Sequence, residues 1–411
     1  MRTIVVAMLV LGVALFPDAG AQGPGSKVIP VTGWSGPKMD DLELLVLAIM
    51  DRHGIPGASL AIARNGKLVF AKGFGFANPA QNQATRPDTL FAVASISKPI
   101  TALAILKLVE EGRLKLDDPV LPLLAPICPW GGARIDPFVG KITLRQLLNH
   151  SGGWDRNKSG DPINWAPQIS RKMGLAGPPS SEQFISFMLG VPLDFAPGTR
   201  EVYSNVGYIM LGKIIEKVTG QGYEAHVRKS VLEPMGIRTA RVHKGQKTYF
   251  DNESYRFVPG TGMVIPPLQL PMLEAAGGWS ISTVELVKLM TAIDGTRGKP
   301  FLSKVMFNTM MAPPPPPIKA RANGIYPGLG FYFVQDTGTG LAFSQNGSWH
   351  GARAFMKRTP ARTSMALACN ASMEPDILDM RLVKDAVHKV REAVEKFRDY
   401  PDVDLFKEFE R

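Results

Sequence analysis

The chain has 411 residues, of which 45% are hydrophobic and 20% are charged. This composition is typical of a globular protein with a large core, so it excludes a disordered or fibrous chain. The formal net charge is +11, but the basic residues are spread along the chain and accompany no nucleic-acid-binding motif. The charge therefore indicates a solvated basic surface and no nucleic-acid partner.

The first 21 residues carry the features of a secretory signal peptide. Arg2 supplies a positive start, an apolar run follows at residues 4–16, and residues 19–21 form an A-x-A cleavage site. The apolar run is too short to span a bilayer, and no later run is long enough. We therefore expect an exported protein, periplasmic or secreted, with 1–21 as the signal peptide, 22–411 as the mature domain and no integral membrane segment. A cytoplasmic N-terminal helix is the alternative.

A helix and a β-hairpin are the first elements predicted after that segment. Apolar residues recur at helical spacing over residues 39–53, and Gly54 follows as a stop signal. Two apolar runs then flank Asn65-Gly66, which is the strongest short signal for a hairpin. The domain is therefore expected to open in the order helix, strand, strand.

The middle of the chain is predicted to be mainly helical. A helical pattern covers Ser95 to Glu111, with Pro99 in the first turn, where its missing N–H has no energetic cost. Residues 151–200 are rich in Gly, Pro and Ser and are expected to form surface loops. Further helices are predicted at residues 142–149, 205–218, 222–233 and 282–293.

Near the C-terminus, short runs rich in aromatic and apolar residues predict antiparallel strands. They lie at 328–334, 341–347, 352–359 and 363–370, and an amphipathic helix follows at roughly 376–398. Strands from both ends of the chain can form one sheet. We therefore predict an α+β fold in which helices flank an antiparallel sheet built from residues 38–115 and 275–400, with a mainly helical insertion at residues 116–274.

The pattern S-x-x-K, which could place a serine nucleophile beside a lysine base, occurs twice. Residues three apart meet only on a helix. Ser35 and Lys38 enclose a Gly-Pro pair, so Lys38 is expected to be exposed and protonated. Ser95 and Lys98 begin an apolar helix, where desolvation lowers the pKa of the lysine and free backbone N–H groups lie near the serine. These features favour the second pair, although a solvated lysine beside an N-terminal helix serine fits the same letters.

The sequence Tyr203-Ser204-Asn205 is the only Y-x-N in the chain and directly precedes a predicted helix. A loop there could present the phenol hydroxyl. A phenol that is hydrogen-bonded to a lysine ammonium loses its proton more easily, so Tyr203 could relay a proton between nucleophile and leaving group.

S-x-x-K followed by Y-x-N resembles the serine β-lactamase and penicillin-binding-protein family, in particular its class C β-lactamase-like branch, which includes esterases, DD-peptidases and D-aminopeptidases. The segments GKLVFAKGFGFAN, TLFAVASISKPITA, ITLRQLLNHSGGW and EAAGGWSIST agree with it, and the resemblance runs from about residue 40 to 395. It implies a β-lactamase/transpeptidase-like fold and an acyl-enzyme on Ser95. It also implies that Lys98 and Tyr203 share the base role, that Asn205 binds substrate or Lys98, and that no cofactor or metal is needed.

The third motif of the family, K-T-G or H-x-G on a strand, is replaced here. Gln345-Asn346-Gly347 occupies its place, and Ser348 follows. The resemblance implies that this strand binds substrate and that the backbone N–H groups of Ser95 and Ser348 form an oxyanion hole. Gly347 would let the backbone pass close to a ligand.

Gln345 offers an N–H but no charge where the lysine of the family helps to hold a substrate carboxylate. A charge-assisted hydrogen bond is roughly twice as strong as a neutral one, so the glutamine favours a substrate without a required carboxylate, such as an ester. Arg353 on the adjoining run is an alternative source of the cation. His350 is expected to line the rim of the pocket, and His150 is expected to cap its helix or pack locally rather than act in catalysis.

We therefore expect an exported serine hydrolase that cleaves a small-molecule ester or amide, most readily a carboxylic ester, or else a cell-wall peptide. A D-amino-acid peptidase or DD-carboxypeptidase, or a class C-type β-lactamase, is the first alternative. A non-catalytic protein that binds cell-wall fragments or β-lactams is the second. Cys128 and Cys369 could pair in an oxidising compartment or could remain separate small hydrophobic residues.

Overall fold

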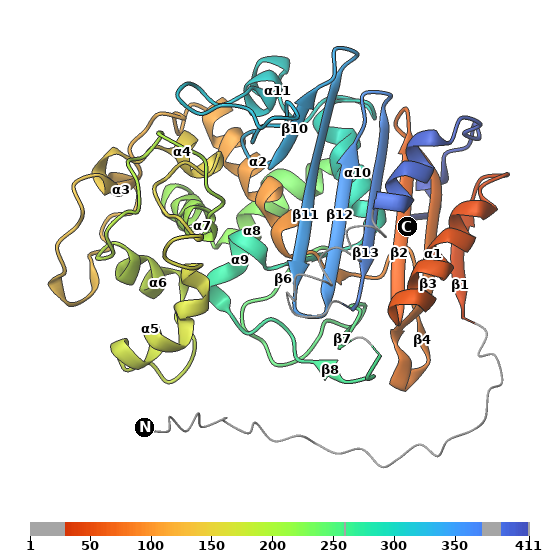
Figure 1. Cartoon of the computed structure of the whole chain (residues 1–411), viewed down its shortest axis with the longest axis horizontal. Helices are drawn as coiled ribbons and strands as arrows, with labels where there is room; N and C mark the ends of the chain where they lie inside the picture. The colour runs from red at the N-terminus through yellow and green to blue at the C-terminus, as the bar shows by residue number, and fades with distance from the viewer. Residues whose placement is uncertain (1–28, 259, 372–387, 410–411) are drawn as a thin grey trace.

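The computed structural model describes residues 29–258, 260–371 and 388–409 (Figure 1). The expected signal peptide, and the part of the expected C-terminal helix at residues 376–387, lie outside the described residues. Within the described ranges, no helix combines the length and the apolar character that crossing a membrane requires.

An antiparallel sheet of eight strands joins the two ends of the described chain. Its order is β1-β3-β2-β13-β12-β11-β10, with the short β4 added beside β3. Figure 1 shows the orange N-terminal strands directly beside the blue C-terminal ones, and β2 pairs with β13 through Ala61 opposite Ala366. The bounds are β1 Val31–Ser35, β2 Gly57–Arg64, β3 Lys67–Asn78, β4 Gln83–Ala84, β10 Phe333–Asp336, β11 Leu341–Trp349, β12 Ala352–Arg358 and β13 Thr363–Cys369.

The first predicted elements are present, and one strand was missed. Helix α1, Asp40–His53, ends at Gly54 in the left-handed conformation, and the hairpin turn places Asn65 and Gly66 at φ of 49° and 82°. Two positive φ values match the turn that an Asn-Gly pair favours. The sequence gives no strong signal for β1, because it is five residues long, contains a glycine and depends on pairing with β3.

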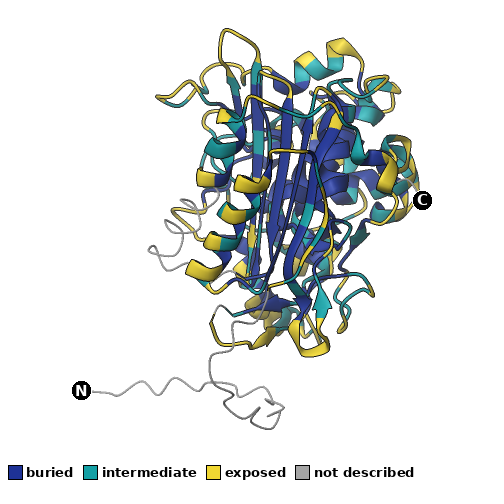
Figure 2. Cartoon of the chain, turned by 90° about the vertical axis from the view of Figure 1, so that its right-hand side faces the viewer, coloured by how far each residue is buried: buried dark blue, intermediate teal, exposed yellow. Residues whose placement is uncertain are grey.

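Helices cover both faces of the sheet and create two separate cores. On one face, α1 and the helix at residues 388–396 enclose a smaller apolar cluster that contains Val46, Phe355 and Val394. The other face packs against the helical half of the molecule, including α2 (Ser97–Glu110) and α10 (Thr283–Ile293). Figure 2 shows the strands as the buried middle of the molecule, with exposed residues on the outer helices.

The helical half contains more regular structure than we predicted. Residues 151–200, which we expected to form loops, include α5 (Ala166–Met173) and α6 (Ser181–Met188). That prediction is wrong because the prolines and serines there mark helix starts. A proline lies in the first turn of α5, and Ser180 forms a capping box with Gln183.

The remaining elements differ from the prediction mainly at their boundaries. The expected helix at 142–149 shortens to α4, the helix at 222–233 becomes α8 followed by a π-helical turn at Arg228–Leu232, and the first of the C-terminal strands begins only at Phe333. Both cysteines are free, with Cys128 exposed and Cys369 buried. The other bounds are α3 Val120–Leu123, α4 Leu144–Leu148, α7 Asn205–Thr219, α8 Tyr223–Val227, α9 Glu274–Gly277, α11 Lys304–Met311, β5 Phe91–Ala92, β6 Arg241–Val242, β7 Arg256–Phe257, β8 Val264–Ile265 and β9 Trp279–Ile281.

Candidate active site

Ser95 lies in a short 3₁₀ turn, Ala94–Ile96, that leads into α2 beside strand β11. The residue before it, Ala94, has a φ of 45°, a conformation that costs free energy for any residue with a Cβ. Strain of this kind persists only where the surrounding structure imposes it. Here the buried packing of α2 and β11 holds the serine at the N-terminal end of the helix.

Lys98 is completely buried one turn further along α2. Its Nζ lies 3.2 Å from Ser95 Oγ, and it donates hydrogen bonds to Asn205 Oδ1 at 2.8 Å and to the carbonyl oxygen of Ala276 at 2.6 Å. Desolvation is the largest influence on this group and lowers the pKa of Lys98 from 10.5 to about 7. A large fraction of the lysine is therefore neutral near pH 7 and can accept a proton.

Tyr203 contacts both Ser95 and Lys98. Its hydroxyl donates to Ser95 Oγ at 2.7 Å, and its ring centroid lies 4.9 Å from Lys98 Nζ. Burial raises the pKa of Tyr203 well above its ordinary value. The phenol is therefore neutral near pH 7 and acts as a hydrogen-bond donor to Ser95.

His150 supports the tyrosine. The two rings stack with centroids 4.5 Å apart, and Nδ1 of His150 accepts a hydrogen bond from the backbone N–H of Ser204. Burial lowers the pKa of His150 well below its ordinary value, so the ring is neutral. His150 thus packs against the tyrosine and the backbone next to it, in a position where its own φ is 62°.

A buried carboxylate that we did not predict completes the network behind Lys98. Asn205 Nδ2 donates to Asp161 Oδ2 at 2.8 Å, and the same oxygen lies 3.4 Å from Arg156 Nη2. Asp161 also caps the short helix Pro162–Trp165 through the backbone N–H of Ile163. The Asp-Pro pair is a signal for such a cap, but the sequence carries no signal that this loop reaches Asn205.

Gly347 on β11 passes directly beside Ser95. A Cβ at this position would lie 1.9 Å from the carbonyl oxygen of Val93 and 3.4 Å from the backbone N of Ser95. No side chain fits in that space, so a glycine is required for β11 to approach the turn that carries Ser95. The oxyanion-hole role of the following residue, Ser348, stays a prediction.

Gln345 lies two residues before Gly347 on β11, so its side chain is on the same face of the sheet as Gly347. It is only 2% exposed. Its Oε1 accepts from the backbone N–H of Tyr332 at 2.9 Å, and its Nε2 donates to the carbonyl oxygen of Asn346 at 3.3 Å. The ring of Tyr332 in turn packs edge-on against Tyr203, with centroids 5.0 Å apart. The amide of Gln345 therefore holds the segment that supports Tyr203, and direct contact between Gln345 and substrate stays a prediction.

Three other residues singled out from the sequence lie on the opposite face of the sheet or in the turn after β11. Arg353 on β12 stands opposite Cys369 on the neighbouring strand β13, and both lie on the face that carries the smaller core. Arg353 therefore does not replace the missing cation of the third motif. Asn346 is exposed opposite Phe355 of that same face, and His350 is exposed in the turn after β11. Their roles in substrate binding stay predictions.

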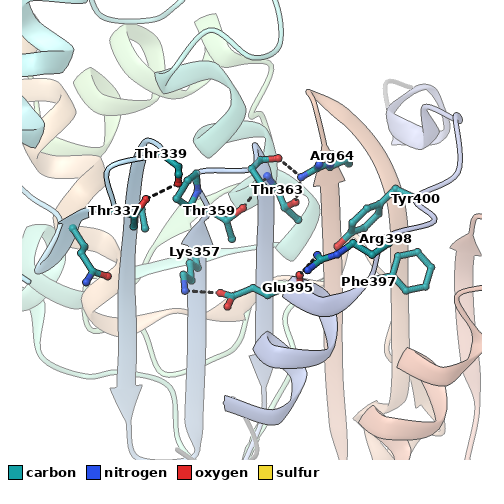
Figure 3. A pocket seen from close by; sticks show the side chains of 14 residues that line it. Arg64, Thr337, Thr339, Lys357, Thr359, Thr363, Glu395, Phe397, Arg398 and Tyr400 are labelled. Carbon is teal, nitrogen blue, oxygen red and sulfur yellow. Dashed lines mark hydrogen bonds and ion pairs between the residues drawn. The ribbon is translucent and has the colours of Figure 1, made fainter. Parts of the chain in front are cut away.

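A pocket of about 600 Å³ opens on the smaller-core face, between the strand ends and the C-terminal helix (Figure 3). Its lining includes Arg64, Lys357 and Glu395. Lys357 pairs with Glu395, and Arg64 donates to Thr363. The sheet separates this pocket from the core that packs against α2, so it is distinct from the site around Ser95.

The geometry around Ser95 agrees with the comparisons with known proteins. Residues 42–388 match the family model described as Beta-lactamase. The chain belongs to the beta-lactamase family. The predicted β-lactamase/transpeptidase-like α+β fold is thereby confirmed, as is the family suggested by the S-x-x-K and Y-x-N motifs.

Individual members of the beta-lactamase family show how far the similarity extends. The chain is 30% identical to a penicillin-binding protein of Bacillus subtilis over 225 residues, which cover 54% of this chain and 46% of that protein. It is 33% identical to Esterase EstB of Burkholderia gladioli over 199 residues, which cover 46% of this chain and 48% of that esterase. The matched parts thus span about half the length of these curated relatives.

Among solved structures, the fold is similar to that of the octameric penicillin-binding protein homologue from Pyrococcus abyssi. The TM-score is 0.66 at 27% identity, and the match covers 85% of this chain and 78% of the other. The likeness therefore extends over most of this member of the family rather than over the site alone.

Proposed function

We propose that this member of the beta-lactamase family is a serine hydrolase that forms an acyl-enzyme on Ser95. One observation carries the proposal: Ser95 Oγ lies 3.2 Å from the Nζ of a buried lysine and 2.7 Å from the hydroxyl of Tyr203. A nucleophile, a base with a lowered pKa and a neutral proton donor are thus within contact of one another, as covalent catalysis requires.

Lys98 is the first base in this proposal. A neutral amine has two N–H groups and one lone pair. The two N–H groups donate to Asn205 Oδ1 and the carbonyl of Ala276, which leaves the lone pair for the hydroxyl of Ser95. The serine proton moves to Nζ as Oγ bonds to the substrate carbonyl carbon, and the carbonyl electrons move to oxygen.

Backbone donors and Tyr203 complete the reaction. The N–H groups of Ser95 and Ser348 stabilise the oxyanion. Its collapse expels the leaving oxygen, which takes the phenol proton of Tyr203, and the ammonium of Lys98 returns a proton to the phenolate. Water then attacks the acyl-enzyme as Lys98 accepts one of its protons. Release of the carboxylic acid returns that proton to Ser95 Oγ.

A neutral carboxylic ester is the proposed substrate. Gln345 carries no charge, and its amide is engaged by Tyr332 and Asn346. Arg156 lies over the ring of Tyr203 and is paired with Asp161. Arg321 lies over the ring of Tyr332 and is paired with Glu201 at 3.2 Å. The site therefore offers little net positive charge to a substrate carboxylate, and the similarity to Esterase EstB supports the same conclusion. The signal-like residues 1–21 support export as part of this proposal.

Two substrates test the proposal on the mature protein. The first is p-nitrophenyl butyrate, a neutral ester, and the second is a chromogenic cephalosporin, which carries a carboxylate. We expect turnover of the ester, no turnover of the cephalosporin, and a butyryl adduct on Ser95 in rapidly quenched samples analysed by mass spectrometry. Cephalosporin turnover on the same serine would support a β-lactamase or peptidase instead. A stable adduct with no turnover would support a binding protein.

A further inference from the structure

The carboxylate of Asp161 is buried and accepts a hydrogen bond from Asn205, whose side-chain oxygen accepts one from Lys98. We infer that Asp161 is a positioning residue for Lys98: its carboxylate holds the oxygen of the Asn205 carboxamide towards the lysine, and its charge, opposed by that of Arg156, acts on the ammonium form. This role in catalysis rests on the proposed hydrolase function.

Hydrogen bonding determines which way the Asn205 amide points. A carboxylate can only accept hydrogen bonds, so the NH₂ group of Asn205 faces Asp161 at 2.8 Å, and its oxygen faces Lys98 at 2.8 Å. Asp161 and Asn205 are 7% and 8% exposed, so water does not compete freely for these contacts. Without the carboxylate, the amide could turn its NH₂ group towards Lys98 and lose its bond to the lysine N–H.

The charges of Asp161 and Arg156 act on Lys98 in opposite directions. Desolvation is the main cause that lowers the pKa of Lys98, Asp161 raises this pKa, and Arg156 lowers it further. Asp161 and Arg156 form one ion pair, so the protonation of Lys98 depends on the difference between the raising effect of Asp161 and the lowering effect of Arg156 on its pKa.

The other titratable groups around Lys98 are neutral near pH 7. The ring of Tyr208 on α7 lies 5.6 Å from Nζ, and burial raises the pKa of both Tyr203 and Tyr208. The neighbouring ring of His150 has a lowered pKa and carries no charge. From α9 comes the neutral carbonyl of Ala276. The Asp161–Arg156 pair is therefore the charged influence on Lys98. Arg156 also lies over the ring of Tyr203, with its Cζ 5.6 Å from the ring centroid, whereas the contacts of Asp161 run through Asn205.

Breaking this ion pair from either side separates a charge effect from a structural one. Asp161→Asn and Arg156→Gln both remove the 3.4 Å contact, so a purely structural role predicts similar losses and no opposite movement of the pH profile. We expect Asp161→Asn to shift the acidic limb of kcat/KM for p-nitrophenyl butyrate down by about one pH unit. Arg156→Gln should shift it up by about half a unit, because its side chain is more exposed. Asp161→Glu, which keeps the charge, should restore most of the parental profile.

Asp155 provides the matched control. It lies in the same loop, is also 7% exposed and pairs with a partly exposed arginine, Arg200, at 3.0 Å. Its other carboxylate oxygen accepts from the backbone N–H of Asn157. Asp155→Asn should leave the midpoint of the acidic limb unchanged. If Asp155→Asn moves the midpoint as far as Asp161→Asn does, or if Asp161→Asn and Arg156→Gln move it in the same direction, the inference is wrong.

A readout without turnover keeps this test separate from the proposed function. The ionisation of Lys98 can be followed by NMR in protein labelled with [ε-¹³C]lysine, with the signal assigned by its loss in Lys98→Arg. A lower midpoint in Asp161→Asn and a higher one in Arg156→Gln support the coupling even if no ester is hydrolysed. Unchanged midpoints overturn the inference, whereas turnover that survives Ser95→Ala overturns the hydrolase proposal alone.

Discussion

The chain contains the same four-residue pattern in two different environments. Ser35 ends the edge strand β1 and donates to Glu43 Oε1 at 3.3 Å, while Lys38 is exposed in the following turn with a φ of 65°. Ser95 lies in the 3₁₀ turn that precedes α2, and Lys98 in the first turn of α2 is buried with its Nζ 3.2 Å from the serine oxygen.

The difference shows that burial, rather than spacing, lowers the pKa of a lysine into the range that the proposed base requires. A lysine in water has a pKa near 10.4 and stays protonated at neutral pH. Packing of α2 against α7 and α9 removes water from Lys98, and its pKa falls to about 7. The same packing supplies two acceptors for its N–H groups, so the buried amine is satisfied as well as desolvated.

The largest expected effect separates the two serines. Ser95→Ala should reduce hydrolysis of p-nitrophenyl butyrate by about a thousandfold or more, because the acyl-enzyme can no longer form. Ser35→Ala should keep the parental kcat and KM. Initial rates of the purified variants, with circular dichroism to confirm folding, test this. Equal activity of Ser95→Ala and the parent would reverse the assignment of the two sites.

Removal of the Tyr203 hydroxyl should have the next largest effect. Tyr203→Phe should lower kcat about a hundredfold for an alkyl ester, whose leaving oxygen needs a proton. The loss should be smaller for p-nitrophenyl butyrate, because nitrophenolate leaves without one. Tyr400→Phe, which removes a hydrogen bond to Val394 on the other face of the sheet, is the control. Equal losses with both esters would argue against a proton-transfer role for Tyr203.

The pH profile should report the burial of Lys98. Because the neutral amine is the base and the pKa of Lys98 is about 7, kcat/KM should fall tenfold per unit below about pH 7 and level off above it. Lys38→Met should leave this profile unchanged. Rates measured from pH 5 to 9 at constant ionic strength test this prediction. A rate constant that keeps rising tenfold per unit up to pH 9 would mean that the lysine is not desolvated.

Removal of the Ser35 hydroxyl should have the smallest effect, and this effect should be on the stability of the fold. Ser35→Ala should change the free energy of unfolding by about 0.5 kcal/mol or less, because it removes one partly buried hydrogen bond on an edge strand. Urea denaturation followed by fluorescence measures this change. A loss above about 1.5 kcal/mol would indicate that Ser35 has a larger structural role than its one hydrogen bond to Glu43 suggests.

Local signals in the sequence predicted much of the fold. The Asn65-Gly66 hairpin, helix α1 with its stop at Gly54, and most C-terminal strands follow from periodicity and turn residues. The two helices in residues 151–200 were missed because a proline and a serine can begin a helix as well as a loop. Strand β1 was missed because its pairing with β3, rather than its own pattern, makes it a strand.

Motifs in the amino-acid sequence were sufficient to identify the candidate residues for the chemistry. Ser95, Lys98 and Tyr203 stand in motifs of the beta-lactamase family, and the apolar pattern after Ser95 indicated that the lysine would be buried. These features are local, because a helix brings residues three apart together and a run of apolar residues predicts a core.

The way in which those candidates are held became visible only in the folded chain. The acceptors of Lys98 lie 107 and 178 residues away, on Asn205 and Ala276. Asp161 reaches Asn205 from a loop that carries no signal of that contact, and Gln345 holds a backbone N–H of Tyr332. Desolvation and amide orientation depend on neighbours in space, and local patterns in a single chain do not record which distant segments those neighbours come from.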